Sequence, residues 1–162
     1  MLKKFVSSLL VLVLMSGCSS STSETETTTA ETASAAQMAA TLVDQLDMDD
    51  LKEVKEHVMY GMFFETRKDA EDKFVTDGVV YRGEDKNSDT IGVFETTDKD
   101  QTLAYLSKYL ETQKANSQMY SPEEVFKIDN AIVEASEDGT VVVLVICNEI
   151  EKAQTAVDEM LK

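Results

Sequence analysis

The spacing of apolar residues predicts that the folded part of the chain begins with a helix. Met38, Leu42 and Leu46 recur at four-residue intervals, which places their side chains on one helical face. An acidic cluster follows at 47–50, and we expect the helix to end near it.

A second, shorter helix is predicted directly after this cluster. Residues 50–53, Asp-Leu-Lys-Glu, have the form of a capping box, in which a Glu three residues after the cap closes the first turn. Leu51, Val54 and Val58 then mark one apolar face, and Gly61 suits the position just after a helix end.

Residues 62–82 carry two competing patterns. Short runs at 74–76 and 79–81 flank Asp77-Gly78 as the strands of a tight hairpin do, whereas 68–73 has a helical composition. We therefore predict only a strand over 79–82 here.

The first of two strand-strand-helix units combines this strand with the next one. A polar loop at 83–89 leads into a strand over 90–96. A helix then begins beside Thr97 and Asp98, both of which offer caps. Its apolar stripe consists of Leu103, Leu106 and Leu110.

A new helical start marks the second unit. Residues 121–124, Ser-Pro-Glu-Glu, place a Ser at the cap, the only Pro at the first helical position and a Glu where it closes the box. Strands at 131–135 and 140–147 then flank a turn at 137–139 as a hairpin. Because 141–146 are apolar without alternation, we expect that strand to be central and covered on both faces.

The last helix is predicted from a further capping-box sequence, Asn-Glu-Ile-Glu at 148–151. Asp98 and Asn148 hold like positions in the two units, which leaves an internal duplication open. The order of elements predicts an α+β fold, with N-terminal helices followed by two strand-strand-helix units that form a mostly antiparallel sheet packed with helices.

The start of the chain has the pattern of a lipoprotein signal peptide. A basic start precedes an apolar run over 5–15, which is too short for a membrane-spanning helix of about 20 residues. The run ends at 14–18, Leu-Met-Ser-Gly-Cys, which resembles the lipobox of bacterial lipoproteins, with Met15 where that motif usually has Leu. The resemblance implies cleavage of a signal peptide at 1–17 and a diacylglyceryl group on Cys18. The alternative is an ordinary signal peptide in which this Cys is incidental.

Composition divides the rest of the chain into two parts. Residues 19–36 are mostly Ser, Thr, Ala and Glu without a large apolar side chain, so no burial offsets the entropy of ordering them. We predict that 18–36 comprises the lipidated Cys and a disordered Ser/Thr-rich tether, and that 37–162 forms a single α+β domain.

The charge of the chain excludes one class of partner. Acidic residues outnumber basic ones 31 to 15, giving a formal net charge of −16, and loss of the two lysines of the signal peptide makes it −18. Nucleic-acid binders neutralise phosphates with Lys and Arg, so we expect no nucleic-acid partner. Such a charge favours cationic partners or divalent ions.

Five short segments carry a resemblance to a known family. They lie at 59–61 (Met-Tyr-Gly), 91–94 (Ile-Gly-Val-Phe), 120–125 (Tyr-Ser-Pro-Glu-Glu-Val), 130–133 (Asn-Ala-Ile-Val) and 141–145 (Val-Val-Val-Leu-Val). In these the chain resembles an uncharacterised lipoprotein family of Gram-positive bacteria, a domain of unknown function, so the resemblance implies no catalytic residues. Some similar proteins are encoded beside membrane-bound O-acyltransferases, which implies a context of envelope-polymer modification.

Candidate catalytic chemistry is sparse. His57 is the only His and is expected to be an exposed helix residue. Cys147 is the only thiol besides Cys18, and we expect it to be buried and inert, with no intramolecular disulfide. Neither a phosphate loop nor zinc-ligand spacing is present, so no cofactor and no catalytic residues are predicted.

A weak calcium-loop candidate lies before the strand at 90–96. Asp85, Asn87 and Asp89 place oxygen ligands at alternating positions, as the start of a calcium loop does. Thr90 stands where such a loop has Gly and Thr96 where it has Glu, so a polar hairpin loop is the favoured alternative and no metal site is predicted.

Four aromatic residues are candidates either for the core, which we favour, or for an exposed binding surface: Phe63, Phe64, Tyr105 and Tyr109. Together the features predict a lipid-anchored lipoprotein at the outer face of the cytoplasmic membrane of a Gram-positive bacterium. We expect a non-enzymatic binding or accessory module of the cell envelope, with an envelope protein or polymer as partner. The alternatives are a small-ligand or cation-binding lipoprotein and an envelope enzyme that uses acidic residues.

Overall fold

The computed structural model describes residues 33–84 and 86–162. The predicted signal peptide, Cys18 and most of the predicted tether lie outside these residues. Within the described ranges, none of the helices has the combination of length and apolarity that crossing a membrane requires.

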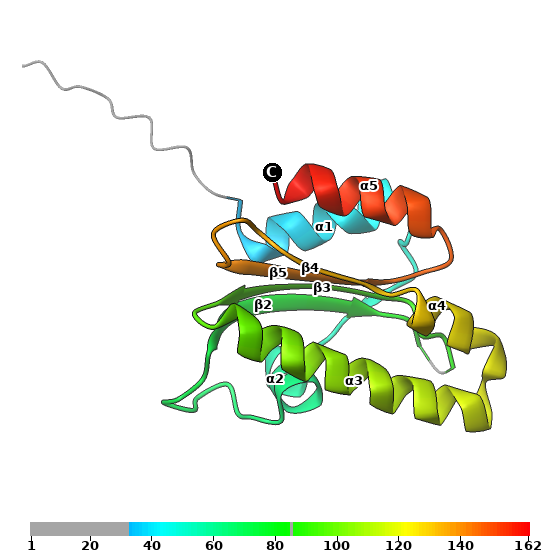
Figure 1. Cartoon of the computed structure of the whole chain (residues 1–162), viewed down its shortest axis with the longest axis horizontal. Helices are drawn as coiled ribbons and strands as arrows, with labels where there is room; N and C mark the ends of the chain where they lie inside the picture. The colour runs from blue at the N-terminus through cyan, green and yellow to red at the C-terminus, as the bar shows by residue number, and fades with distance from the viewer. Residues whose placement is uncertain (1–32, 85) are drawn as a thin grey trace, which may run out of the picture. The chain divides into compact units, whose positions relative to one another are not determined.

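A five-stranded antiparallel sheet forms the middle layer of the domain (Figure 1). Its strands are β1 (Lys52–Glu53), β2 (Val75–Arg82), β3 (Thr90–Thr96), β4 (Ile132–Ala135) and β5 (Val141–Ile146). The spatial order is β1-β2-β3-β5-β4, so β3 and β5 pair in the interior while β1 and β4 form short edges.

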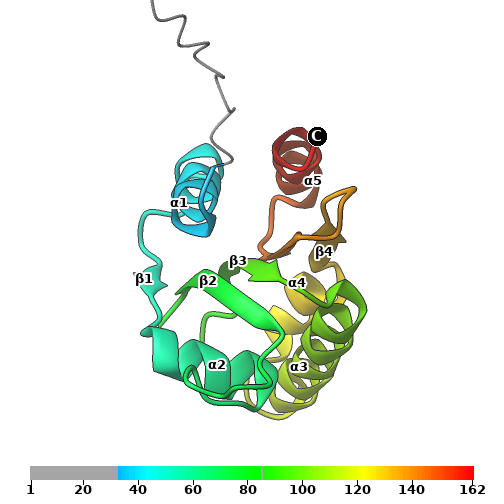
Figure 2. The same cartoon turned by 90° about the vertical axis from the view of Figure 1, so that its left-hand side faces the viewer.

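Helices cover both faces of this sheet (Figure 2). They are α1 (Ala35–Gln45), α2 (Glu56–Phe64), α3 (Lys99–Tyr120), the 3₁₀ helix η1 (Pro122–Glu124), α4 (Val125–Asp129) and α5 (Ile150–Met160). One face packs against α1 and α5, and the other packs against α2, α3 and α4. The predicted α+β fold is confirmed, with three layers.

Strand β5 contributes to both hydrophobic layers. Val141, Val143 and Val145 belong to the cluster under α1 and α5. The residues between them, which include Val142 and Leu144, belong to the cluster over α2 and α3. Successive side chains of a strand point to opposite faces, so alternate residues of this continuous apolar run are buried in two different hydrophobic clusters. The prediction of a central strand covered on both faces is confirmed.

The hydrophobic cluster between the sheet and helices α2 and α3 is rich in aromatic rings. Phe94 meets Phe64 edge-on at 5.0 Å between ring centroids and Phe63 at 5.7 Å. Two glycines of the sheet leave room for it, because a Cβ at Gly92 would lie 2.8 Å from the Phe94 ring and one at Gly78 would lie 3.0 Å from it. Phe63, Phe64 and Phe94 are fully buried.

The predicted second helix exists, but the start and end predicted for it are wrong. Lys52–Glu53 pairs with Tyr81 and Arg82 as β1, and α2 begins only at Glu56. Leu51 belongs to the cluster under α1, whereas Val54 packs against the opposite cluster, so the two side chains point to opposite faces as in a strand. Gly61 lies inside α2 rather than after it.

The ambiguous segment at 62–82 contains one long strand. Asp77-Gly78 lies within β2, and the ladder shifts register between Val75 and Asp77, so the tight hairpin does not form. Residues 68–73 form turns instead of a helix. The strand predicted at 79–82 is the last half of β2.

Only some of the helix caps predicted from the sequence form in the structure. Asp98 caps α3, accepting a hydrogen bond from the Gln101 N–H at 2.9 Å, as predicted. Ser121 makes no side-chain cap. Glu149, without a side-chain cap bond, stands at the start of α5, so the cap predicted at Asn148 is wrong.

The domain begins earlier than predicted. Ser34 and Gln37 form a capping box, with the Ser34 N–H donating to Gln37 Oε1 at 3.0 Å. Helix α1 starts at Ala35, so the last two residues of the segment predicted to be a disordered tether are helical.

The two strand-strand-helix units are not copies of each other in space. β3 and β5 run antiparallel. If the two units were copies related by a two-fold axis perpendicular to the sheet, the helix after each strand would lie on the same face of the sheet. Instead α3 and α5 lie on opposite faces (Figure 1). The units therefore differ in handedness, which argues against an internal duplication.

We predict that the aromatic layer dominates the stability of the domain. Phe64→Ala should lower the free energy of unfolding by about 3–5 kcal/mol, because it removes a fully buried ring. The matched change Phe126→Ala, at a side chain that is 61% exposed, should alter it by less than about 0.5 kcal/mol. Urea unfolding followed by circular dichroism measures both, and equal losses would contradict the assignment of the core.

Candidate functional site

The large exposed apolar residues lie on one side of the domain. Among the described residues they are Val58, Met62, Met119, Tyr120 and Phe126. All five belong to α2, α3 or α4, and α1 and α5 contribute none. Exposed apolar residues confined to one helical layer make that layer the candidate interaction surface.

The most exposed of these residues stand where α3 turns into η1 and α4. Met119, Tyr120 and Phe126 are 72%, 69% and 61% exposed, and we call them the α3 corner. The preceding stretch of α3, residues 111–118, has no large apolar side chain. An ion pair between Lys114 and Asp129 joins α3 to α4 beside the corner.

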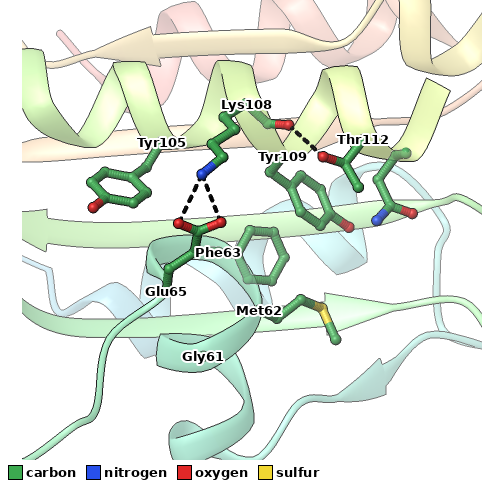
Figure 3. A pocket seen from close by; sticks show the side chains of 9 residues that line it. Gly61, Met62, Phe63, Glu65, Tyr105, Lys108, Tyr109 and Thr112 are labelled. Carbon is green, nitrogen blue, oxygen red and sulfur yellow. Dashed lines mark hydrogen bonds and ion pairs between the residues drawn. The ribbon is translucent and has the colours of Figure 1, made fainter. Parts of the chain in front are cut away.

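One hollow lies between α2 and α3 (Figure 3). Its volume is about 140 Å³, and the rings of Phe63 and Tyr109, 4.2 Å apart between centroids, form part of its wall. Lys108 Nζ lies 2.8 Å from the carboxylate of Glu65 across it. This hydrogen bond raises the pKa of the Lys108 ammonium, so the charged groups of the hollow already satisfy each other.

A second hollow, the corner hollow, opens beside the α3 corner and has a volume of about 170 Å³. Its lining residues come from the end of β2, the loop before β3 and the end of α3: Arg82, Lys86, Asn87, Ser88, Gln113, Asn116, Ser117, Tyr120 and Ser121. Gln113 lines both hollows, so the two depressions adjoin along α3.

Two further hollows, of about 340 Å³ each, lie toward the ends of the described chain. One includes Ala33 and Ser34, and the other includes Met38 and Lys162. The lining of the first hollow includes Ala33, the residue next to the part of the chain outside the described residues. We assign neither hollow a site.

A buried cluster of charged groups ties the loop before β3 to α4. Lys127 Nζ lies 2.7 Å from Glu124 Oε2 and 2.8 Å from Asp89 Oδ1, and only 6% of the lysine side chain is exposed. Ser88 donates to Glu124 Oε2 from its backbone N–H at 2.8 Å and its hydroxyl at 2.7 Å. The loop wall of the corner hollow is thereby fixed to the helix.

This cluster engages the calcium-loop candidates that the structure describes. Asn87 Oδ1 accepts from Lys127 Nζ at 3.1 Å, and Asp89 Oδ1 pairs with the same ammonium. Asp85 lies outside the described residues. The Lys127 ammonium supplies the positive charge that these two oxygens face. Among the described residues, no group of three His, Cys, Asp or Glu side chains could hold a metal ion.

The cluster also shifts the acidity of its members. Burial disfavours the charged form of Glu124, but the hydrogen bonds from Lys127 and Ser88 outweigh it and lower the pKa of that carboxyl. Burial likewise opposes the charge on Lys127, and the bonds to Asp89 and Glu124 outweigh it and raise the pKa of the ammonium.

The other sequence candidates are structural. His57 is exposed in the first turn of α2, as expected. Cys147 is buried, as predicted, and its burial raises the pKa of the thiol, which disfavours the reactive thiolate. Phe63, Phe64 and Tyr109 are core residues and Tyr105 is half-buried, so the favoured core assignment holds for the first three.

Sequence reasoning did not single out the buried Lys127 or the exposed apolar pair Met119 and Tyr120. Lys127 gives no local sign of burial, because Asp89 and Glu124 reach it from two different segments. Met119 and Tyr120 do carry a signal, since they form an isolated apolar pair after eight residues without a large apolar side chain.

Comparison of the chain with protein-family models, curated proteins and solved structures finds no match to any of them. The functional argument therefore rests on the geometry of the described residues.

We predict that removing the buried cation destabilises the domain. Lys127→Met should cost about 3–5 kcal/mol of unfolding free energy, because it leaves two poorly hydrated carboxylates without their partner. The matched change Lys152→Met breaks exposed pairs with Asp47 and Glu149 and should cost far less, because solvent screens these charges. Urea unfolding at pH 7 compares the two, and equal costs would show that the cluster is effectively solvated.

The lowered pKa of Glu124 sets a pH dependence. Its contribution to stability is complete above the unfolded value near 4.5 and is lost as the pH falls through the lower folded value. Glu124→Gln should therefore be less stable than wild type at pH 7, and the difference should shrink between pH 5 and pH 3. Urea unfolding across this range measures it, and a difference independent of pH would refute the role of the carboxylate charge.

Proposed function

We propose that the chain is a membrane-anchored binding module of the cell envelope, held at the outer face of the cytoplasmic membrane by a lipid on Cys18. The observation that carries the proposal is the gathering of all large exposed apolar residues of the described chain on α2, α3 and α4. Two adjoining hollows lie on the same face.

The position of α1 supports the use of this face. The chain enters the domain at Ser34, in the layer of α1 and α5, on the opposite side of the sheet from α3. The residue at which the chain enters the domain therefore lies on the opposite side of the sheet from the face of α2, α3 and α4. We propose this face as the one that a partner in the envelope binds.

The state of the charged groups favours binding over catalysis. Acid-base catalysis uses carboxyls or amines whose proton affinity suits transfer to a substrate. Beside the hollows, Glu65 is paired with Lys108 and Glu124 is paired with Lys127. The hydrogen bonds of these pairs stabilise the charged forms of Lys108, Glu124 and Lys127, which suits a structural role.

Site-specific crosslinking tests the proposal. Benzoylphenylalanine is introduced at Tyr120 or Phe126 of the full chain in its native cell, with Thr155, exposed on α5, as the control position. We expect discrete adducts from the α3 corner and none from the control after irradiation and mass spectrometry.

The lipid anchor is tested in the same cells. Cys18→Ser keeps the surface but removes the lipid, and adducts should fall by at least about tenfold because tethering raises the effective concentration of the module. Adducts of equal yield at Thr155, or none at the α3 corner from correctly lipidated protein, would overturn the proposed binding face.

A further inference from the structure

The corner hollow differs in charge from the rest of the chain. Its lining combines two cations, Arg82 and Lys86, with three amides, three serines and one tyrosine, and none of the described lining residues is acidic. Across the whole chain, acidic residues outnumber basic ones 31 to 15. A depression with cations, amides and hydroxyls suits a ligand that is both anionic and rich in hydrogen-bonding groups.

Arg82 has unused hydrogen-bonding capacity. Its Nη1 donates to Met62 Sδ at 3.4 Å, and thioether sulfur is a weak acceptor. Its Nε is buried and has no partner among the described residues. None of the ion pairs of the described chain includes this guanidinium, although carboxylates and phosphates are its preferred partners.

Two carboxylates beside the hollow are bound to a different cation than Arg82. Glu124 and Asp89 are held by Lys127, and Ser88 donates twice to Glu124. These contacts also fix the loop that carries Ser88 before any ligand arrives, which lowers the entropic cost of binding.

The other wall of the hollow presents neutral polar groups. None of the hydrogen bonds among the described residues uses the side chains of Gln113, Asn116 or Ser117. Beside them the ring of Tyr120 is 69% exposed. Amides and hydroxyls exchange hydrogen bonds with sugar hydroxyls, and an exposed aromatic ring offers a flat apolar surface to a sugar ring.

The size of the hollow indicates that it holds part of a ligand. Its volume of about 170 Å³ lies below the roughly 300 Å³ at which pockets begin to enclose a drug-sized molecule. The negative net charge of the domain opposes an anion here only weakly, because exposed charges more than about 8 Å away are largely screened at physiological ionic strength.

We propose that the corner hollow binds an acidic saccharide, with its carboxylate or phosphate on Arg82 and Lys86 and its hydroxyls on Gln113 and Asn116. This inference rests on the proposed function and names the ligand class of the same face.

Calorimetric titration of the full chain in detergent micelles tests the inference. The probes are trigalacturonate, phosphorylated maltotriose and neutral maltotriose, and the first two distinguish a carboxylate from a phosphate as the bound group. We expect at least one acidic probe to bind, and the neutral one to bind at least about tenfold more weakly, since a hydrogen bond to a charged group is worth about 1.5–3 kcal/mol.

The two arginines of the chain provide matched variants. Arg82→Gln should raise the Kd of the acidic probe by about tenfold or more. Arg67→Gln, which removes the same charge from an exposed loop residue paired with Asp69, should leave the Kd within about twofold. If Arg82→Gln does not fold, Lys86→Gln, at an exposed side chain, takes its place and should weaken the same probe.

Two results would overturn the inference: equal binding of acidic and neutral probes, or no binding of either acidic probe at millimolar concentration to folded wild-type chain. Adducts at Tyr120 in the cell, without saccharide binding, would remove this inference and leave the proposed function standing. If neither adducts at Tyr120 nor saccharide binding were observed, the proposed binding face itself would be refuted.

Discussion

The pairing of β3 with β5 in the interior of the sheet is the constraint from which the remaining architecture follows. Every residue of β5 is buried, and its side chains alternate between two clusters. A strand that is apolar on both faces requires a helical layer on each. Helices α1 and α5 supply one layer, and α2, α3 and α4 supply the other, so one strand accounts for the order of all three layers.

The candidate binding surface lies where this layered core ends. The apolar stripe of α3 stops at Leu110, and the helix continues to Tyr120 with mainly polar residues. The loop before β3 meets that extension and is fixed to α4 through Lys127. A rigid scaffold thus positions groups that the core does not use, which is the usual relation between a fold and its functional loops.

Local patterns predicted the elements whose partners are close in sequence. The hairpin of β4 and β5 and the Asp98 cap depend on contacts within a few residues. The segment around Leu51 and Val54 could not be assigned in this way, because the same two apolar residues fit one helical face or the two faces of a strand, and only pairing with β2 decides.

The candidate site was predicted least well, for the same reason. Glu124 was expected to close a capping box, yet its carboxylate binds Ser88 and Lys127. Ser88 is 36 residues away along the chain, and no local pattern reports such a contact. The loop at 83–89 was correctly predicted as polar, but its attachment to α4 depends on the three-dimensional fold.

The short edge strands have a consequence for neighbouring copies. An open strand edge is a template for pairing with another chain, and the danger rises with local concentration. Here β1 has only two residues, Lys52 and Glu53, both exposed and charged, and β4 has four, with Glu134 among them. If the proposed lipid anchor concentrates copies on a membrane, their exposed edges are short and carry charged residues, which disfavours lateral sheet growth.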